Sequence, residues 1–362
     1  MRNKNVTYTK AIGIMLMVLG HCGCAIPYAK QTLYMFHMPL FFFLSGYCFK
    51  YNHLDNPGLF LWKRIKGLYW PFIKWGLIFL VLHNVFYNLH IYDDEYGFRN
   101  KGSHLYDLEE FAIKAYQVLK MCHIEELLGG FWFLNALFFG SIIAFIFLHI
   151  SSRFDKKSYC NKKILYIIML GVSLLAVILL DRTHFLIPWL HLGAQPFLAT
   201  TFFLSGQAFK EFRIKKFNLC LGVISFIFVF VGGFFWRVQT AEKFYPNSKI
   251  LPYILTAILG IWCIYSLPWE KLRNHIAAFL LFVGNKTLII LTWHFLSFKL
   301  VSLIIIFIYN LSIERLAEFP HISEYADQGW WIVYFVTGVG LPLLFVFIIN
   351  TTKFVFERKI TG

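Results

Sequence analysis

Residues 15–27 read MLMVLGHCGCAIP and place a histidine, His21, inside an apolar run that begins at Ala11. The run is typical of a helix in a lipid bilayer, where an imidazole is energetically unfavourable. Ionisable side chains at such depth usually face the interior of a helix bundle or a water-filled cavity, and they are candidates for function. The structural alternative is a neutral histidine whose hydrogen bonds go to a backbone carbonyl or a second helix. His21 is therefore the first residue that needs an explanation.

The composition supports a membrane location for the rest of the chain. Of its 362 residues, 58% are hydrophobic and only 15% are charged, whereas soluble domains contain about half apolar and about a quarter charged residues. The first apolar run is not expected to be a cleaved signal, because no small-residue cleavage site follows it and further apolar runs continue. The seven cysteines have no regular spacing, so they predict free thiols and no metal site.

Ten apolar stretches are each long enough to cross a hydrocarbon core, which takes about 20 helical residues. Lipid requires backbone hydrogen bonds to be satisfied within a segment, and the runs do not alternate as barrel strands would. The predicted fold class is therefore an all-α polytopic membrane protein with a single membrane domain over residues 1–362. The predicted spans are 10–26, 33–50, 68–90, 130–150, 163–180, 187–209, 217–236, 250–267, 286–311 and 330–352.

The distribution of charge predicts the orientation of these spans. With the N-terminus in the cytoplasm, the cytoplasmic segments hold 21 Lys and Arg residues against five acids, and the opposite face holds ten against fourteen. This bias follows the positive-inside rule and places both termini in the cytoplasm, as expected for a multi-pass protein of the cell membrane. The net charge of +15 then reflects short cytoplasmic loops near anionic lipid, and it does not indicate nucleic-acid binding.

One connection between predicted spans is unusually long. Residues 91–129, on the outer face after the third span, include a stretch from Leu105 to Leu128 with the pattern of one or two amphipathic helices. A structureless connection of this length is uncommon in a compact protein. We therefore expect a partly helical cap over the outer face.

Polar residues near the outer ends of the spans are candidates for a functional site. Lys10 precedes His21 by eleven positions, which puts both side chains on one helical face about 16 Å apart. His37 opens the second span, and Trp132 and Asn135 open the fourth. An interfacial position also explains His37, and the aromatic belt of membrane proteins also explains Trp132. Asn135 has no such structural explanation.

The ninth span contains a second imidazole. His294 lies seven residues after Thr287 on the same helical face, inside the predicted hydrocarbon region. Lys299 follows within the same span, whereas Lys74 is close enough to the cytoplasmic side to extend its ammonium group back to water. His294 and Lys299 are therefore further candidates for function.

A basic cluster marks the cytoplasmic end of the third span. Lys63, Arg64 and Lys66 belong to the stretch KRIK, and such side chains bind phosphate groups as well as orienting a helix. The sequence has no glycine-rich nucleotide loop, no HExxH or GxSxG and no carboxylate cluster within the spans. Those absences argue against a metalloprotease or an ATP-driven pump.

Five of these stretches, taken in order, resemble motifs of the membrane acyltransferase-3 family, especially of its fucose-acetylase-like members. TKAIGIMLMVLGH has the basic residue and the histidine of the family's first helix, here Lys10 and His21, and KRIKGLYWPF aligns Arg64 and Pro71 with the basic stretch before the third helix. The other matches are FHMPLFFFLSGYCF, the Trp-Phe-Leu motif in GGFWFLNALF, and the late Gly-x-x-Ser/Thr motif that ends in histidine in GNKTLIILTWHF. The motifs extend from residue 7 to residue 295.

The resemblance implies transfer of an acyl group, usually acetyl, from cytoplasmic acyl-CoA to a hydroxyl of a glycan or similar acceptor at the outer face. It makes His21 the catalytic candidate, with acyl-CoA as the donor substrate and no bound cofactor. The chain departs from the family at two places. Thr7 stands where members often have an acidic residue, and Lys10 stands where many have arginine.

Together these observations give a hypothesis for the mechanism, in which His21 acts as a general base or as an acyl relay. Basic residues at the inner mouth would bind the phosphates of acyl-CoA: Lys10, Lys63, Arg64 and Lys66. Polar and aromatic residues would contact the acceptor or support His21: His37, Trp132, Asn135 and His294.

Two other classes of protein fit the same composition. One is a transporter or flippase for a glycan or small solute, with His21 and His294 along a polar path, although no repeated halves are visible. The other is a polymerase or ligase of surface polysaccharide, which would also be polytopic with a large outer loop. Release of free CoA from radiolabelled acetyl-CoA would separate an acyltransferase from both.

Overall fold

A computed structural model gives the fold of this chain. It describes residues 3–98, 102–154, 159–183, 193–214, 218–236 and 250–361. Within these ranges the regular structure is entirely helical, with no β-strand. The predicted all-α class is confirmed.

Every apolar stretch that the sequence assigns to the membrane contains a described helix, although residues 187–192 and residue 217 of the predicted spans lie outside the described residues. In chain order the corresponding helices are α1 (Lys4–His21), α2 (Ala29–Tyr47), α5 (Trp70–Val81) with α6 (His83–Asn88), α8 (Trp132–Phe154), α9 (Tyr159–Thr183), α10 (Ala194–Glu211), α11 (Leu219–Trp236), α12 (Ile250–Tyr265), α14 (Thr287–Tyr309) and α16 (Trp331–Thr361).

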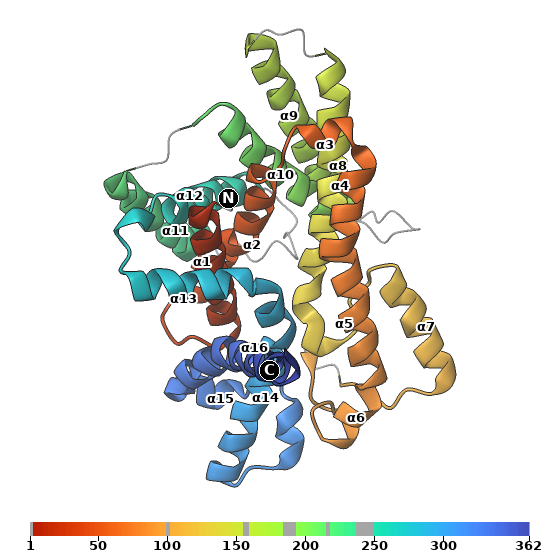
Figure 1. The fold of residues 1–362 in the computed structure, drawn as a ribbon. Coiled ribbons are helices and arrows are strands. Elements are labelled where there is room, and N and C mark those ends of the chain that lie inside the picture. Colours follow the sequence, from red (N-terminus) through yellow and green to blue (C-terminus); the bar gives the residue numbers. More distant parts are fainter. Residues whose placement is uncertain are drawn as a thin grey trace.

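Shorter helices connect these elements. They are α3 (Asn52–Asp55), α4 (Pro57–Arg64), α7 (Leu108–Leu119), α13 (Asn274–Asn285) and α15 (Ser323–Tyr325). A π-helical turn over Ile65–Tyr69 joins α4 to α5, and a 3-10 turn over Glu126–Phe131 leads into α8. Figure 1 shows α4 and α5 as one long rod beside α8, with α7 lying along α5.

Five helical segments within the described residues are long and apolar enough to cross a bilayer, judged by length and composition. These segments are Glu126–Arg153, Lys162–Thr183, Ile250–Lys271, Thr287–Tyr309 and Ser323–Thr351. They make the chain a polytopic membrane protein. The total of ten spans and the cytoplasmic position of both termini stay predictions.

Two helices differ from the sequence expectation. Residues 274–285, expected in a cytoplasmic connection, form α13, and a Cβ at its Gly284 would overlap the carbonyl of Thr7 on α1. Helix α1 begins at Lys4 instead of residue 10 and ends at His21. The chain leaves α1 through Gly23, which has φ +70° and packs so closely on His321 that a Cβ there would lie 2.7 Å from its ring. Tertiary contacts, which local sequence does not show, set these boundaries.

Helices α2 and α10 cross at backbone contact distance. A Cβ on Gly46 of α2 would overlap the carbonyl oxygen of Phe203, and a Cβ on Gly206 of α10 would overlap that of Phe43. Small residues let helix backbones approach this closely in membrane proteins. Gly46 serves helix packing here, and the crossing fixes the position of α2 in the bundle.

The α2–α10 crossing predicts a stability effect. Gly46→Ala should destabilise the folded protein by about 1–3 kcal/mol, because an added methyl group in a packed contact forces the helices apart. The measurement is thermal unfolding of the purified protein in detergent. Gly171→Ala on α9 is the control, since nothing lies within 4 Å of a Cβ there, and its midpoint should not fall. Equal midpoints for Gly46→Ala and the unsubstituted protein would contradict the close crossing.

Candidate active site

The end of α1 opens into a cavity of about 970 Å³, which we call the His21 cavity. Its wall comes from α1, α2, the start of α8, α14 and the connections around residues 98–106, 123–126 and 319–323. His21 is partly exposed, and the exposed side chains of Lys30 and Phe98 also belong to the wall. The imidazole therefore faces a cavity and is not sealed among hydrocarbon side chains.

Tyr34, one helix away on α2, holds the ring of His21. Its hydroxyl lies 2.9 Å from Nδ1 of His21 and 3.3 Å from the carbonyl oxygen of Gly20, which can only accept. When the hydroxyl proton goes to Gly20, Nδ1–H of His21 donates to the Tyr34 oxygen. With hydrogens assigned in this way, the Tyr34 hydroxyl, the Gly20 carbonyl and Nδ1 of His21 all have hydrogen-bond partners. Nε2 of His21 is then the unprotonated ring nitrogen.

His294 lies directly behind His21. Their ring centroids are 5.6 Å apart, and His294 is fully buried. Its Nδ1 donates to the carbonyl oxygens of Ile290 and Leu291 at 3.1 and 3.0 Å, while Nε2 is buried with no hydrogen-bond partner. His294 is therefore a neutral neighbour of His21, and the sequence prediction that it lies beside the site agrees with this geometry.

The other predicted acceptor-side residues divide between the cavity and the scaffold. His37 and Trp132 belong to the wall of the His21 cavity. Nδ1 of His37 donates to the carbonyl oxygen of Leu33 at 2.6 Å. Asn135 instead donates to the carbonyl oxygen of Met121 at 3.0 Å, and it is not among the residues that form the wall.

A second cavity, of about 360 Å³, lies on the other side of the site, and we call it the basic cavity. Lys10, Lys63 and Arg64 belong to its wall, whereas Lys66 is exposed outside it. The guanidinium of Arg64 donates to the hydroxyl of Ser45 at 3.0 Å. Burial lowers the pKa of Arg64 to about 10, so this side chain keeps its positive charge at neutral pH. The basic cavity can therefore attract an anion.

The two cavities meet inside the bundle. Met17, Met38 and Leu291 contribute to the walls of both. Methionine side chains are flexible and adapt to an irregular or changing space. A long, thin ligand that entered beside Arg64 would thus reach His21 by displacing only these apolar side chains.

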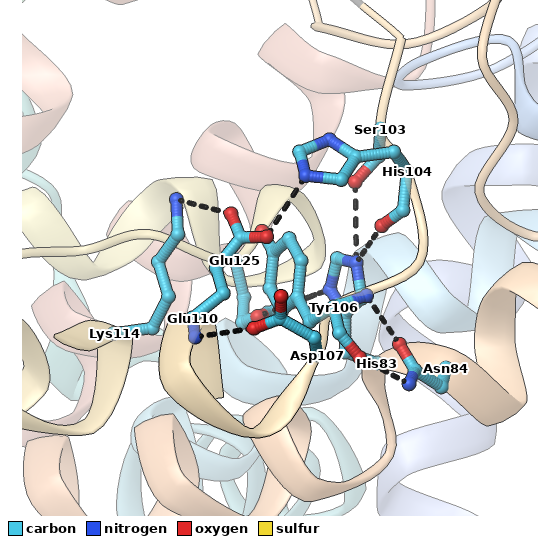
Figure 2. A network of polar contacts seen from close by, with 9 residues as sticks. All are labelled: His83, Asn84, Ser103, His104, Tyr106, Asp107, Glu110, Lys114 and Glu125. Atoms are coloured by element: carbon cyan, nitrogen blue, oxygen red, sulfur yellow. Dashed lines mark hydrogen bonds and ion pairs between the residues drawn. The ribbon is translucent and has the colours of Figure 1, made fainter. Parts of the chain in front are cut away.

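A polar network in the long outer loop closes the far side of the His21 cavity. Nδ1 of His83 lies 3.1 and 3.2 Å from the two oxygens of Glu125, and its Nε2 lies 3.0 Å from the carbonyl of His104. Tyr106 stacks on the ring of His83 with centroids 3.5 Å apart. Figure 2 shows this network.

Tyr92 completes the polar network by donating to Glu125 at 3.0 Å. Burial and the Glu125 carboxylate raise the pKa of Tyr92 well above its ordinary value, so the hydroxyl stays a donor. Asn84 binds the backbone of Tyr106 through two hydrogen bonds of 2.9 Å. The network was not predicted from the sequence, because its members are far apart along the chain.

Lys299, a buried lysine whose role the sequence does not explain, holds a segment that forms part of the cavity wall. Its buried ammonium donates to the carbonyl oxygens of Leu316 and Glu318 at 2.9 Å each. The bonds hold the segment that carries Phe319 and His321 to the cavity wall. Burial, reinforced by the charge of Lys30, lowers the pKa of His321 to about 4, so that ring is neutral at pH 7.

The sequence itself matches a known family over most of its length. A family model described as an acyltransferase domain covers residues 3–350. The chain belongs to the acyltransferase-3 family. No curated protein and no solved structure matches it.

Membership of the acyltransferase-3 family makes the protein a membrane acyltransferase. Within the described part of the chain, no group of three or more His, Cys, Asp or Glu side chains is arranged to hold a metal ion. The titratable groups that face the His21 cavity are histidines, tyrosines, carboxylates, Lys30 and Cys24. Among them His21 combines partial exposure with a hydrogen-bonded Nδ1, which leaves Nε2 for the proton transfer of a general base.

Tyr34→Phe tests the hydrogen bond to His21. The substitution keeps the aromatic ring and removes the hydroxyl, and one such bond contributes about 0.5–1.5 kcal/mol. We expect kcat for acyl transfer to fall about 2- to 12-fold, with KM for the acyl donor unchanged. Tyr28→Phe, at a tyrosine outside both cavities, is the matched control. Identical kcat values for the two variants would show that Tyr34 does not orient His21.

Proposed function

We propose that this membrane acyltransferase moves an acyl group, in the simplest case acetyl, from cytoplasmic acyl-CoA to a hydroxyl of a cell-surface glycan or similar acceptor. His21 is the proposed catalytic residue. Support comes from one observation above the rest: His21 lines the larger cavity, which shares the wall residues Met17, Met38 and Leu291 with the basic cavity. The arrangement gives a donor and an acceptor separate approaches to one imidazole.

The donor occupies the basic cavity in this proposal. The phosphates of acyl-CoA pair with Arg64, Lys63 and Lys10, because charge-assisted hydrogen bonds to phosphate are strong where water is scarce. The pantetheine arm passes Met17 and Met38 and brings the thioester to His21. Lys66, which lies outside the basic cavity, reaches only the entrance.

His21 then accepts one proton and passes it on. The acceptor hydroxyl gives its proton to Nε2 while its oxygen attacks the thioester carbonyl. The C–S bond breaks, the departing thiolate takes the proton from Nε2, and the ester and free CoA leave with His21 neutral again. In the relay variant, Nε2 attacks the thioester carbonyl, the C–S bond breaks and CoA departs as the thiolate. The acceptor oxygen then takes the acyl group from Nε2 as the C–N bond breaks, and the hydroxyl proton goes to the thiolate.

The acceptor occupies the His21 cavity. Trp132, which is partly exposed, offers an aromatic face there, and Glu126 and Ser103 offer hydrogen-bonding groups. Such a mixture suits the ring and hydroxyls of a sugar. The transporter alternative is not favoured by membership of an acyltransferase family.

His21→Ala tests the catalytic proposal. Loss of a general base lowers the rate by about 10²–10⁴-fold, so transfer of label from acetyl-CoA to glycan should nearly vanish while the protein stays folded by gel filtration. His275→Ala, at an exposed histidine of α13, is the control and should keep full activity. Near-normal transfer by His21→Ala would end the proposal for this residue.

Arg64→Ala tests the donor site. Hydrogen bonds to charged groups contribute about 1.5–3 kcal/mol, so KM for acyl-CoA should rise about 10- to 100-fold. Lys66→Ala removes a nearby positive charge that lies outside the cavity wall, and it should change KM by less than about twofold. Equal effects of the two substitutions would indicate general attraction by surface charge and would contradict a phosphate site at Arg64.

A further inference from the structure

Helix α7 in the long outer loop carries its apolar side chains on the outside. The exposed face is almost entirely apolar, with Ile113 50% exposed and Tyr116 59% exposed. Its exposed residues follow helical spacing along one side: Leu108, Glu109, Ala112, Ile113, Tyr116 and Leu119. A helix that faced water would turn its polar side outward.

Of the charged side chains of α7, Glu109 belongs to the exposed set, whereas Glu110 and Lys114 are partly buried on the other side. Glu110 and Lys114 form an ion pair at 3.7 Å, each with a side chain 27% exposed. Lys114 lies over the ring of Tyr106, which belongs to the wall of the His21 cavity. Figure 2 shows the ion pair on the same side as the polar network around His83. α7 therefore turns its apolar side outward, the reverse of what a helix that covers a protein in water would do.

α7 also lies along part of a predicted membrane span. Val118 packs on Gly76 of α5, and at the other end Asn84 of α6 binds the backbone of Tyr106 just before α7 begins. Figure 1 shows α7 alongside α5. The apolar side chains of Val81 on α5 and Val85 on α6 are exposed as well.

Side chains of the protein donate hydrogen bonds to the backbone carbonyls at the C-terminal end of α7. The carbonyl of Leu119 accepts a hydrogen bond from the hydroxyl of Tyr69 at 3.1 Å, and the carbonyl of Met121 accepts one from Asn135 at 3.0 Å. Terminal carbonyls in water need no such partners, whereas in hydrocarbon each unsatisfied group is strongly unfavourable. These bonds also give a reason for the polar Asn135 near the start of α8.

We propose that α7 is a membrane-embedded helix whose apolar face contacts the acyl chains of the bilayer. Its inverted pattern, its position along α5 and its satisfied carbonyls all indicate a hydrocarbon surrounding. The remaining parts of the loop, around residues 92–106 and 123–126, line the His21 cavity. One wall of that cavity is therefore anchored in lipid, independently of which reaction the site performs.

Photo-crosslinking in proteoliposomes tests the lipid contact. A benzophenone amino acid replaces Ile113 in one variant and Tyr116 in another, and mass spectrometry detects lipid adducts after illumination. Both positions are exposed, so the variants should elute like the unsubstituted protein in gel filtration. We expect lipid adducts at both positions.

Two further positions calibrate the crosslinking. Phe307, 88% exposed on the apolar helix α14, is the positive control, and Asp55, exposed on the polar connection that holds α3, is the negative control. Adduct yields at residues 113 and 116 should match Phe307 and exceed Asp55. Yields as low as that of Asp55 would overturn the proposal. Crosslinks to a second copy of the chain in place of lipid would overturn it as well.

Discussion

The structure depends on the hydrogen bonding of one imidazole, that of His21, inside an apolar helix bundle. His21 ends α1, and its Nδ1 pairs with the Tyr34 hydroxyl at 2.9 Å across to α2. A buried polar group without a partner is unfavourable, so this bond couples the positions of the two helices. Because Nδ1 is used in this way, Nε2 is the ring nitrogen that is left for proton transfer. The packing of α1 on α2 therefore determines which nitrogen of His21 can react.

The rest of the bundle keeps that ring between two different environments. One side offers positive charge, with Arg64 against Ser45, and the other offers aromatic and hydrogen-bonding groups held by the Glu125–His83 pair. Met17 and Met38 separate the two with flexible apolar side chains. Lys299 and Asn135, polar residues within apolar helices, both donate to backbone carbonyls of neighbouring segments. Buried polar groups in this fold thus fix the connections that shape the cavity.

The sequence was sufficient to predict the helical class and the location of each apolar helix, because lipid imposes long apolar runs. It also predicted that His21, His37, Trp132 and Asn135 would lie at one site near the outer ends of their helices, and the structure places the first three, but not Asn135, on the wall of the His21 cavity. It did not reveal Tyr34, which is one tyrosine in an aromatic-rich run, or the His83–Glu125 pair, whose members are 42 residues apart. Helix α13 and the early start of α1 depend on contacts such as Gly284 against Thr7, which only the folded chain shows.

A structure of the protein with a thioether analogue of acetyl-CoA, determined by cryo-electron microscopy, would test the central claim most directly. The account predicts the phosphates beside Arg64 in the basic cavity and the analogue's acetyl carbon facing Nε2 of His21. An acceptor oxygen within hydrogen-bond reach of Nε2 would then lie about 3–3.5 Å from that carbon, as a reacting pair requires. An analogue bound with its acetyl group on the far side of Met17 and Met38 from His21, or entirely outside the basic cavity, would contradict it.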